Sequence, residues 1–154
     1  MEAADFFHDH GLQLVLQHSG LAAPFPDSYP VYLIVEVAGS DSLDELASAL
    51  AEIGQVQDAA MAKSRAERHR LWALREGHTL AISAAGIPVK LDVAVPTARL
   101  EEFEDRVLET IRAHVPGAET VLFGHLVEGN VHVNILDVPD PDKELVTDAA
   151  LRVM

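Results

Sequence analysis

The sequence predicts an α+β fold, a ferredoxin-like α/β sandwich with a mostly antiparallel sheet. Short β-rich runs alternate along the chain with stretches of helical periodicity, a pattern typical of helices packed on one sheet. Two β-rich runs then follow each other over residues 120–137 around a glycine-containing turn, which predicts an antiparallel hairpin. One apolar stripe predicts a helix that covers the sheet. Its members recur at spacings of three and four: Leu100, Phe103, Val107, Ile111 and Val115.

Three helices and two strands are predicted in the first half of the chain. Residues 4–18 have helical periodicity, although a His-Asp-His-Gly sequence interrupts it, and a proline-rich loop follows. Residues 31–37 are rich in β-branched side chains and predict a strand. Ser-x-x-Glu capping boxes predict helices over 42–53 and 64–85, with a second strand between them over 55–61.

The second half continues the alternation. Residues 89–95 predict a strand that ends before a proline, and Thr97 is placed to cap the helix that carries the apolar stripe. After the hairpin, Asp140 followed by Pro141 suits a helix N-terminus, so a last helix is predicted to begin near residue 141.

Composition limits the function classes that this chain can serve. Its 154 residues, 49% of them hydrophobic, suffice for one ordinary core, so we expect a single domain over residues 1–154. The absence of cysteine excludes a disulfide framework and a thiolate metal site. A net charge of −14 argues against a nucleic-acid-binding protein. No apolar run approaches the roughly 20 residues of a membrane-spanning helix, and no signal peptide is recognisable, so we expect a cytoplasmic protein.

Basic side chains are concentrated in one part of the predicted helix. Five of the eleven lie within thirteen positions: Lys63, Arg65, Arg68, Arg70 and Arg75. Such a group forms either a solvated helix face or a docking surface for an anionic partner, such as a carboxylate, a flavin phosphate or an acidic domain.

Two histidines flank the turn of the predicted hairpin. Strand alternation places His132 and Asn134 on one face of its second strand, away from the apolar side chains. With Glu128 and Gly129 at the tip, residues whose numbers sum to 257 pair, so His125 faces His132 with Cβ atoms roughly 5 Å apart. Two imidazoles at that separation can share one metal ion.

A simpler interpretation of the pair is two solvated or hydrogen-bonded side chains, because two histidines are too few ligands to close a metal site. The other six histidines are predicted to lie on the surface: His8, His10, His18, His69, His78 and His114.

Residues 124–134, GHLVEGNVHVN, resemble the Gly-His-x-x-x-Gly-Asn-x-His-x-Asn signature of the C-terminal domain of FAD-linked oxidases. That family includes D-lactate dehydrogenase, the glycolate oxidase flavin subunit and D-2-hydroxyglutarate dehydrogenase. Two further blocks match in the same order: residues 71–79 resemble the family's Trp-x-x-Arg-Glu helix, and residues 89–96 resemble its lysine-bearing strand that ends at a proline. The usual family turn has glycine where this chain has Val127, and a β-branched residue there predicts a changed turn.

The resemblance implies roles for individual residues. Four match substrate-binding positions of the family: Arg75, Thr79, Lys90 and Asn134. Arg75 and Thr79 are four apart on one predicted helix and so share a face, where a guanidinium and a hydroxyl can hold a carboxylate. His125 and His132 match metal ligands, and imidazole with oxygen ligands suits zinc, iron or manganese.

The implied function is that of a substrate- and metal-binding cap domain in an FAD-dependent D-2-hydroxy acid dehydrogenase of the lactate, glycolate or 2-hydroxyglutarate type. A divalent metal such as zinc would polarise the substrate hydroxyl, Arg75 and Lys90 would hold the carboxylate, and a hydride would pass to the flavin. His132 is the histidine expected nearest to the proton that is removed. The implied partners are a small 2-hydroxy acid and the FAD-binding domain of the parent enzyme.

Nothing in the sequence resembles the family's FAD-binding domain or its downstream Ser-x-Glu-His-Gly segment, which supplies a third metal ligand and a catalytic histidine. We therefore expect a domain truncated at both ends, which alone neither holds FAD tightly nor turns over substrate.

Two other functions remain open at the level of sequence. One is a stand-alone ferredoxin-like module that binds a small carboxylate or dimerises through its sheet, without catalysis; three ordered family motifs are not needed for such a role. The other is an independent metal hydrolase built on His125 and His132, which would lack a third ligand and has only Glu128 nearby as a general base.

Overall fold

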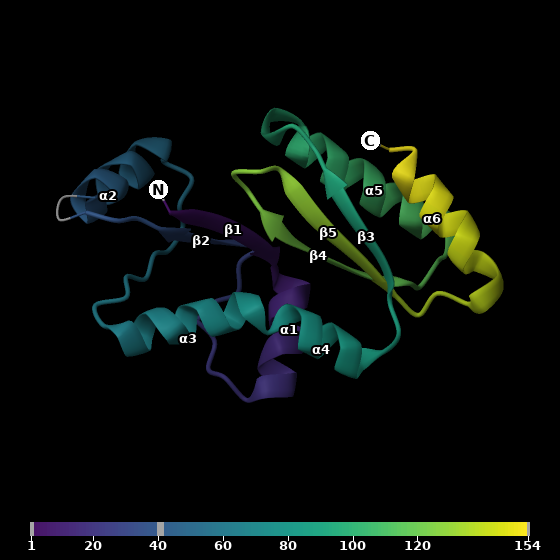
Figure 1. Cartoon of the computed structure of the whole chain (residues 1–154), viewed down its shortest axis with the longest axis horizontal. Coiled ribbons are helices and arrows are strands. Elements are labelled where there is room, and N and C mark those ends of the chain that lie inside the picture. Colours follow the sequence, from purple (N-terminus) through teal and green to yellow (C-terminus); the bar gives the residue numbers. More distant parts are fainter. Residues whose placement is uncertain (1, 40–41, 154) are drawn as a thin grey trace.

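A five-stranded antiparallel sheet forms the centre of the molecule (Figure 1). The computed structural model describes residues 2–39 and 42–153. The strands are β1 (Ala3–His8), β2 (Val31–Glu36), β3 (Val89–Ala94), β4 (Glu119–His125) and β5 (Asn130–Leu136). They lie in the order β2-β1-β4-β5-β3, and all neighbours pair antiparallel. The predicted α+β sandwich with an antiparallel sheet is confirmed.

Helices cover both faces of the sheet (Figure 1). The helices are α1 (Asp9–Ser19), α2 (Ser42–Ile53), α3 (Arg65–Glu76), α4 (His78–Ala85), α5 (Leu100–His114) and α6 (Lys143–Leu151). Among the described residues, no side chain of α2 belongs to either buried core. On one face, α5 and α6 pack against the odd-numbered side chains of β5, among them Val131 and Val133. On the opposite face, α1, α3 and α4 bury Leu12, Leu74 and Ile82 against aromatic side chains of β1 and β4. None of the helices in the described ranges could cross a bilayer.

The predicted helix over residues 4–18 is wrong in its first third, residues 4–8, which belongs to strand β1. Strand β1 lies between β2 and β4, and helices bury both of its faces: Phe6 belongs to the core under α5, and Phe7 to the core under α1. A strand that is apolar on both faces has no visible alternation, so its sequence does not distinguish it from the start of a helix. The chain turns into α1 at Asp9.

The single predicted helix over 64–85 is also wrong, because it is divided into α3 and α4 at Gly77. A Cβ at this glycine would lie 2.9 Å from Cγ1 of Val15, so the glycine allows the close approach of α1. The capping box at Ser64 is confirmed: its hydroxyl accepts a hydrogen bond from the Glu67 backbone, and the Glu67 carboxylate accepts one from the Lys63 backbone.

Residues 55–61 form no regular structure, so the predicted strand there is wrong. The side chains of this segment are exposed, and it offers too few apolar groups to stabilise a further strand at the edge of the sheet. The preceding helix α2 has the predicted bounds, but the Ser42 side chain of its capping box lies outside the described residues.

Short 3-10 turns lead into both C-terminal helices. Residues Thr97–Arg99 precede α5, and Thr97 donates its hydroxyl hydrogen bond to the Leu126 carbonyl instead of capping the helix. Residues Asp140–Asp142 precede α6, where the Asp140 carboxylate pairs with the Lys143 side chain.

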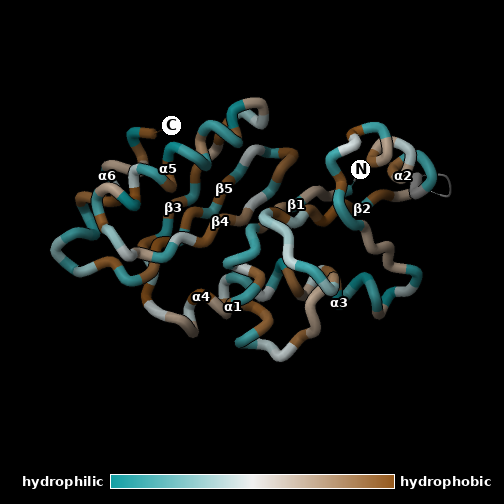
Figure 2. The backbone as a smooth tube through the Cα atoms, turned by 180° about the vertical axis from the view of Figure 1, so that it is seen from behind, coloured by the Kyte–Doolittle hydropathy of each residue, from teal (hydrophilic) through white to brown (hydrophobic). Residues whose placement is uncertain are grey.

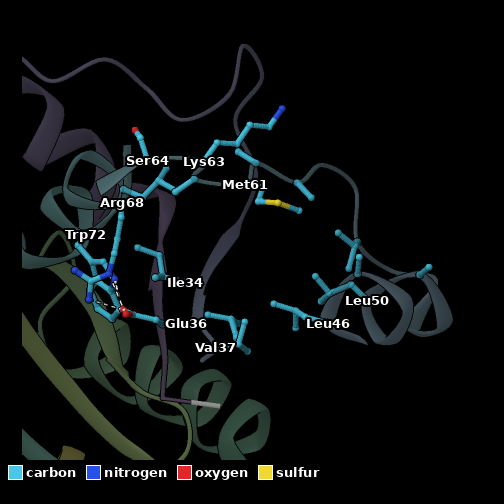
Figure 3. Close-up of a pocket in the computed structure, with 18 of the residues that line it drawn as sticks. Ile34, Glu36, Val37, Leu46, Leu50, Met61, Lys63, Ser64, Arg68 and Trp72 are labelled. Atoms are coloured by element: carbon cyan, nitrogen blue, oxygen red, sulfur yellow. Dashed lines mark hydrogen bonds and ion pairs between the residues drawn. The ribbon is translucent and has the colours of Figure 1, made fainter. Parts of the chain in front are cut away.

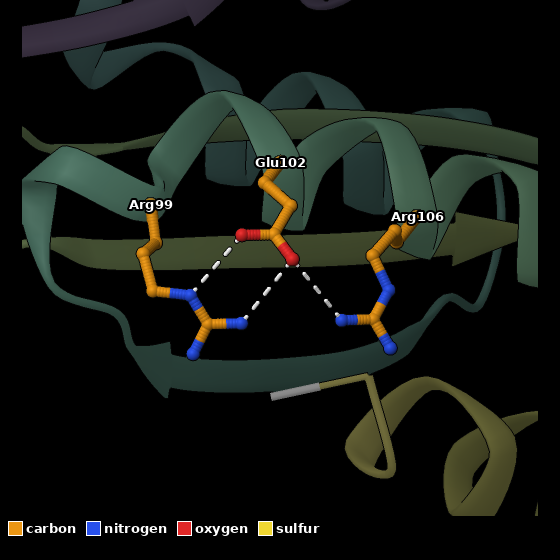
Figure 4. A network of polar contacts seen from close by, with 3 residues as sticks. All are labelled: Arg99, Glu102 and Arg106. Carbon is orange, nitrogen blue, oxygen red and sulfur yellow. Dashed lines mark hydrogen bonds and ion pairs between the residues drawn. The ribbon is translucent and has the colours of Figure 1, made fainter.

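The apolar stripe of α5 is buried as predicted, and Figure 2 shows hydrophilic and hydrophobic segments alternating along this helix. Its outer side carries an exposed Arg99–Glu102–Arg106 network (Figure 4).

The hairpin of β4 and β5 pairs in a different register from the prediction. Paired residues sum to 255, so His132 faces Phe123 and His125 faces Asn130. The turn needs positive φ only at Gly129, where φ is 64° and a Cβ would lie 2.0 Å from the Val95 carbonyl oxygen. Among the described non-glycine residues only Asp137 has positive φ, so Val127 fits the turn without strain.

Candidate functional site

An acid–histidine–histidine–acid row crosses four neighbouring strands of the sheet. Asp5 on β1 pairs in register with His125 on β4, and Asp92 on β3 pairs in register with His132 on β5. The shift of register by two residues makes the histidines diagonal neighbours on the same face of the hairpin. Their ring centroids lie 5.5 Å apart at an interplanar angle of 81°. The structure therefore brings the predicted histidine pair together, although not directly opposite each other.

Each histidine of the row has a carboxylate behind it. Nδ1 of His125 lies 3.0 Å from Oδ1 of Asp5, and Nδ1 of His132 is in contact with Oδ1 of Asp92. A carboxylate at one ring nitrogen holds a proton there when the imidazole is neutral, which leaves the lone pair on Nε2. Both Nε2 atoms can then bind a metal or accept a proton.

Arg75 extends from α3 to the end of this row. Its Nε lies 3.0 Å from Oδ2 of Asp5, and its Cζ lies 4.5 Å from the centroid of the Phe123 ring. The side chains of Asp5 and Arg75 are 8% and 9% exposed, so the ion pair is largely shielded from water. Burial lowers the pKa of the Arg75 guanidinium, and the charge of Asp5 opposes that shift, so the guanidinium stays charged. A planar cation thus lies beside the histidines, as the carboxylate-binding role requires.

His78 lies beneath Arg75 and is completely buried, so the prediction that it lies on the surface is wrong. Its Nδ1–H donates to the Arg75 carbonyl at 3.0 Å, and its ring contacts Phe123 at a centroid distance of 5.0 Å. Nε2 has no hydrogen-bond partner among the described residues. Desolvation lowers the His78 pKa to about 4, and the hydrogen bond to Arg75 opposes this only partly, so the imidazole is neutral near pH 7. A Cβ on Gly11 would lie 2.7 Å from Nε2, so the glycine makes room for this ring.

Lys90 and Asn134 pair in register on β3 and β5, two residues along each strand from the Asp92–His132 pair. Strand alternation puts both on the face that carries the histidines. Lys90 is exposed, whereas Asn134 is 5% exposed. Asn130, a signature position with no role assigned from the sequence, lies opposite His125, and its buried Oδ1 has no hydrogen-bond partner within the described ranges. Its alternation with His132 and Asn134 is the signal that could have identified it.

Thr79 does not share the environment of Arg75. It lies beyond the break at Gly77, in the first turn of α4, and it is exposed whereas Arg75 is buried. The expectation that the two side chains occupy one helix face depended on a continuous helix, which the chain does not form.

The rest of the basic group lies away from this row. Lys63, Arg65 and Arg70 are exposed, and Arg68 donates two hydrogen bonds to the Glu36 carboxylate. A hollow of about 1110 Å³ lies between β2, α2 and α3, with Arg68 at one end (Figure 3). Figure 3 shows Leu46 and Leu50 of α2 across it. No residue of the acid–histidine row lines this hollow, so it is not the same site.

The described ranges contain no group of three or more histidine and acidic side chains arranged to hold a metal ion. The row therefore offers two imidazoles with a carboxylate behind each. The sequence indicated neither carboxylate of the row: Asp5 lies within residues 4–18, which had been predicted to be helical, and Asp92 was predicted only as part of the strand over residues 89–95.

Comparison with known proteins places the chain. Residues 1–153 match the family model of FAD linked oxidases, C-terminal domain. The chain belongs to this family. The resemblance carried by the three sequence blocks is thereby confirmed.

The similar curated proteins are mainly D-2-hydroxyglutarate dehydrogenases. The one from Xanthomonas citri pv. viticola is 37% identical over 88% of this chain and 29% of its own length. The mitochondrial one from Rattus norvegicus is 35% identical over 88% of this chain and 26% of its own length. A putative mitochondrial D-lactate dehydrogenase of Schizosaccharomyces pombe is 30% identical over 88% of this chain and 28% of its length. The chain thus spans less than a third of the length of these relatives.

Proposed function

We propose that this chain is the substrate- and metal-binding cap domain of an FAD-dependent D-2-hydroxy acid dehydrogenase, most similar in substrate class to the 2-hydroxyglutarate and lactate enzymes. The observation that carries the proposal is the row from Asp5 to Asp92, because it combines two carboxylate-backed imidazoles with a buried guanidinium on one face. An α-hydroxy carboxylate needs these two kinds of group, a cation for the carboxylate and a metal or base for the hydroxyl.

The substrate carboxylate is assigned to Arg75, with Lys90 as a second cation. Arg75 has a planar fork of donors, one edge of which faces Asp5, while Lys90 is free to reach from the exposed edge strand. Asn134 lies between the Lys90 and His132 positions and can hydrogen-bond the substrate through its amide. Thr79 remains a proposed substrate contact, from the first turn of α4.

The two histidines of the row fit part of the ligand set of a divalent metal ion. Two imidazoles bound to one tetrahedral ion have ring centroids about 5 Å apart, given metal–nitrogen distances near 2 Å. The observed 5.5 Å is close to this value, and a carboxylate behind each ring is the usual outer partner of a metal-bound histidine. We propose His125 and His132 as ligands of zinc or a similar ion, completed by groups outside this chain. A bound divalent ion would supply Lewis acidity that lowers the pKa of the substrate hydroxyl.

In the reaction the C–H bond at the α-carbon breaks, and the hydroxy acid becomes a 2-oxo acid. Bound FAD would supply the two-electron acceptor that takes this hydrogen as hydride. His132 is the residue of this chain proposed nearest to the hydroxyl proton: its Nδ1 is backed by Asp92, and its Nε2 accepts that proton where no metal occupies it. Where Nε2 ligates the ion instead, the proton would leave to a base outside this chain. Arg75 holds the carboxylate so that the reacting bonds keep one orientation. The FAD is expected to be held mainly by a domain not present in this sequence, and the 154-residue chain alone is expected to be inactive.

The test is the mass and visible absorption spectrum of the native polypeptide purified from its source cells. A product about three times this length, in line with the 29% coverage of a relative, whose flavin bands are bleached by D-2-hydroxyglutarate or D-lactate, would support the proposal. Arg75→Ala would abolish bleaching at low substrate concentration, while Arg70→Ala, an exposed arginine on the same helix, would leave it unchanged. A colourless product of 154 residues would contradict the proposal and favour the stand-alone carboxylate-binding or dimerising module.

A further inference from the structure

One carboxylate connects the guanidinium and the imidazole of this site. We propose that Asp5 is a positioning residue of the site. Its carboxylate fixes the Arg75 guanidinium on the Phe123 ring and holds His125 in the Nδ1–H tautomer. The inference deepens the proposed function and rests on it for the identity of the ligands. The geometry and the test below depend on neither metal nor flavin.

Each oxygen of Asp5 lies against one partner. The contact with His125 is a hydrogen bond, and the contact with Arg75 is an ion pair, since the Arg75 Nε makes no hydrogen bond among the described residues. Oδ1 lies 3.0 Å from His125 Nδ1, and Oδ2 lies 3.0 Å from Arg75 Nε. The carboxylate cannot follow one partner without leaving the other, because its backbone is paired on both sides, with Ile34 of β2 and with His125 of β4. The acid is therefore held in place by the centre of the sheet, and the two functional side chains are oriented against it.

For Arg75, Asp5 is the counter-charge in a shielded environment. The guanidinium comes from another element, α3, and lies over a ring of β4, so Asp5 and Phe123 together define its place. Without the carboxylate, a buried cation would lack its partner and would be drawn towards water. The planar fork would then leave the orientation needed to bind a second carboxylate.

For His125, Asp5 decides which nitrogen is available. The carboxylate can only accept a hydrogen bond, so the neutral ring places its proton on Nδ1 and its lone pair on Nε2. Neutral imidazole in water favours the opposite tautomer, with the proton on Nε2. A ring in that tautomer would present a proton instead of a lone pair to a metal or to substrate.

Asp5 is distinguished from the second acid of the row by burial. The Asp92 side chain is 73% exposed, whereas that of Asp5 is 8% exposed. Water competes with the contact between Asp92 and His132, but it has little access to the contacts of Asp5. Asp5 therefore orients His125 more firmly than Asp92 orients His132, and Asp5 is also the acid that contacts Arg75.

Long-range proton–nitrogen NMR correlation of the 154-residue chain tests this, at a pH of about 8.5, where ordinary histidines are neutral, and with a chelator present. In the wild type we expect His125 as Nδ1–H and an upfield ring-current shift of the Arg75 side-chain protons. In Asp5→Leu we expect His125 to become mainly Nε2–H and the Arg75 shift to be lost. Glu119→Leu, which removes an exposed acid 3.3 Å from His10, is the matched control and leaves both signals unchanged.

Should Asp5→Leu fail to fold, the double variant Asp5→Leu/Arg75→Leu removes the buried charge together with its partner, and His125 is still expected to change tautomer. An Nε2–H tautomer of His125 in the wild type would overturn the proposal. So would an Asp5→Leu chain in which either signal keeps its wild-type position. Failure of the flavin test with these NMR results intact would reject the enzyme function and leave the positioning role standing.

Discussion

Oδ1 of Asp5 lies 3.0 Å from Nδ1 of His125, a residue 120 positions later in the chain. The contact exists because β1 is inserted between β2 and β4, so that the first strand becomes a central strand of the sheet. The candidate site is therefore assembled by strand order and not by a local motif. Changes to the sheet and changes to the site are expected to be coupled.

Neutralising Asp5 is expected to destabilise the fold. Asp5→Asn leaves the largely buried Arg75 charge without its partner, and we expect the free energy of unfolding to fall by about 3–5 kcal/mol. Urea denaturation followed by circular dichroism measures the change. The matched control is Glu102→Gln, which breaks an exposed acid–arginine network on α5 and is expected to leave the midpoint unaltered (Figure 4). Equal midpoints for Asp5→Asn and the wild type would show that the ion pair does not stabilise the fold.

His78 is expected to make stability depend on pH. Its pKa is lowered from 6.5 to about 4 in the folded chain, so below pH 6.5 the unfolded state binds a proton that the folded state does not. Stability is therefore fully present above about pH 6.5 and is lost as the pH falls towards 4, by about 3 kcal/mol for this group. Denaturation of wild-type and His78→Leu chains between pH 7.5 and about 4 isolates the contribution, because carboxylates affect both equally.

For the same comparison, His114→Leu serves as the control. This histidine is exposed, and its Nδ1 donates a hydrogen bond to the Thr110 carbonyl of its own helix. Its replacement is expected to keep the wild-type pH dependence. If the His78→Leu chain lost stability with the same slope as the wild type, the buried histidine would not be the titrating group.

The longest helix was predicted correctly because it has one buried and one solvated face. In this helix, α5, Phe103, Val107 and Ile111 are buried, while acidic and basic residues between them are exposed. The capping box at Ser64 was also predicted correctly, because it involves only residues close in sequence. The alternation that placed His125, His132 and Asn134 on one face survived a register error, because a shift of two residues preserves the face.

The parts that were missed depend on contacts distant in sequence. β1 was not predicted because helices distant in sequence bury both of its faces, α5 over Phe6 and α3 and α4 on the side of Phe7. Asp5 could not then be assigned to the site, and the break at Gly77 depends on the approach of Val15 from α1. His78 was predicted to lie on the surface because histidine is polar. In the structure, Gly11 leaves room for its ring in the core, and the Arg75 carbonyl accepts its hydrogen bond.

Gly124 is expected to tolerate no side chain. A Cβ at this position would lie 2.0 Å from the Asn130 carbonyl oxygen, on backbone that cannot rotate away. We expect Gly124→Ala to lower the free energy of unfolding by about 2 kcal/mol or more, because the hairpin that carries both histidines has to shift. Thermal unfolding measures this. In the control Gly86→Ala, the new Cβ would meet only the flexible Leu136 side chain at 3.3 Å, and a loss as large as that of Gly124→Ala would contradict the argument.

In the flavin-containing enzyme of the proposed function, Arg75→Lys is expected to raise KM for a D-2-hydroxy acid about 10- to 100-fold with a smaller change in kcat. Lysine keeps the charge opposite Asp5 but loses the planar pair of donors that a carboxylate binds. Steady-state kinetics measures the changes in KM and kcat separately. The control is Arg70→Lys, at an exposed position of the same helix, which is expected to match the wild type. A variant with unchanged KM and strongly reduced kcat would assign Arg75 to the chemical step instead of to carboxylate binding.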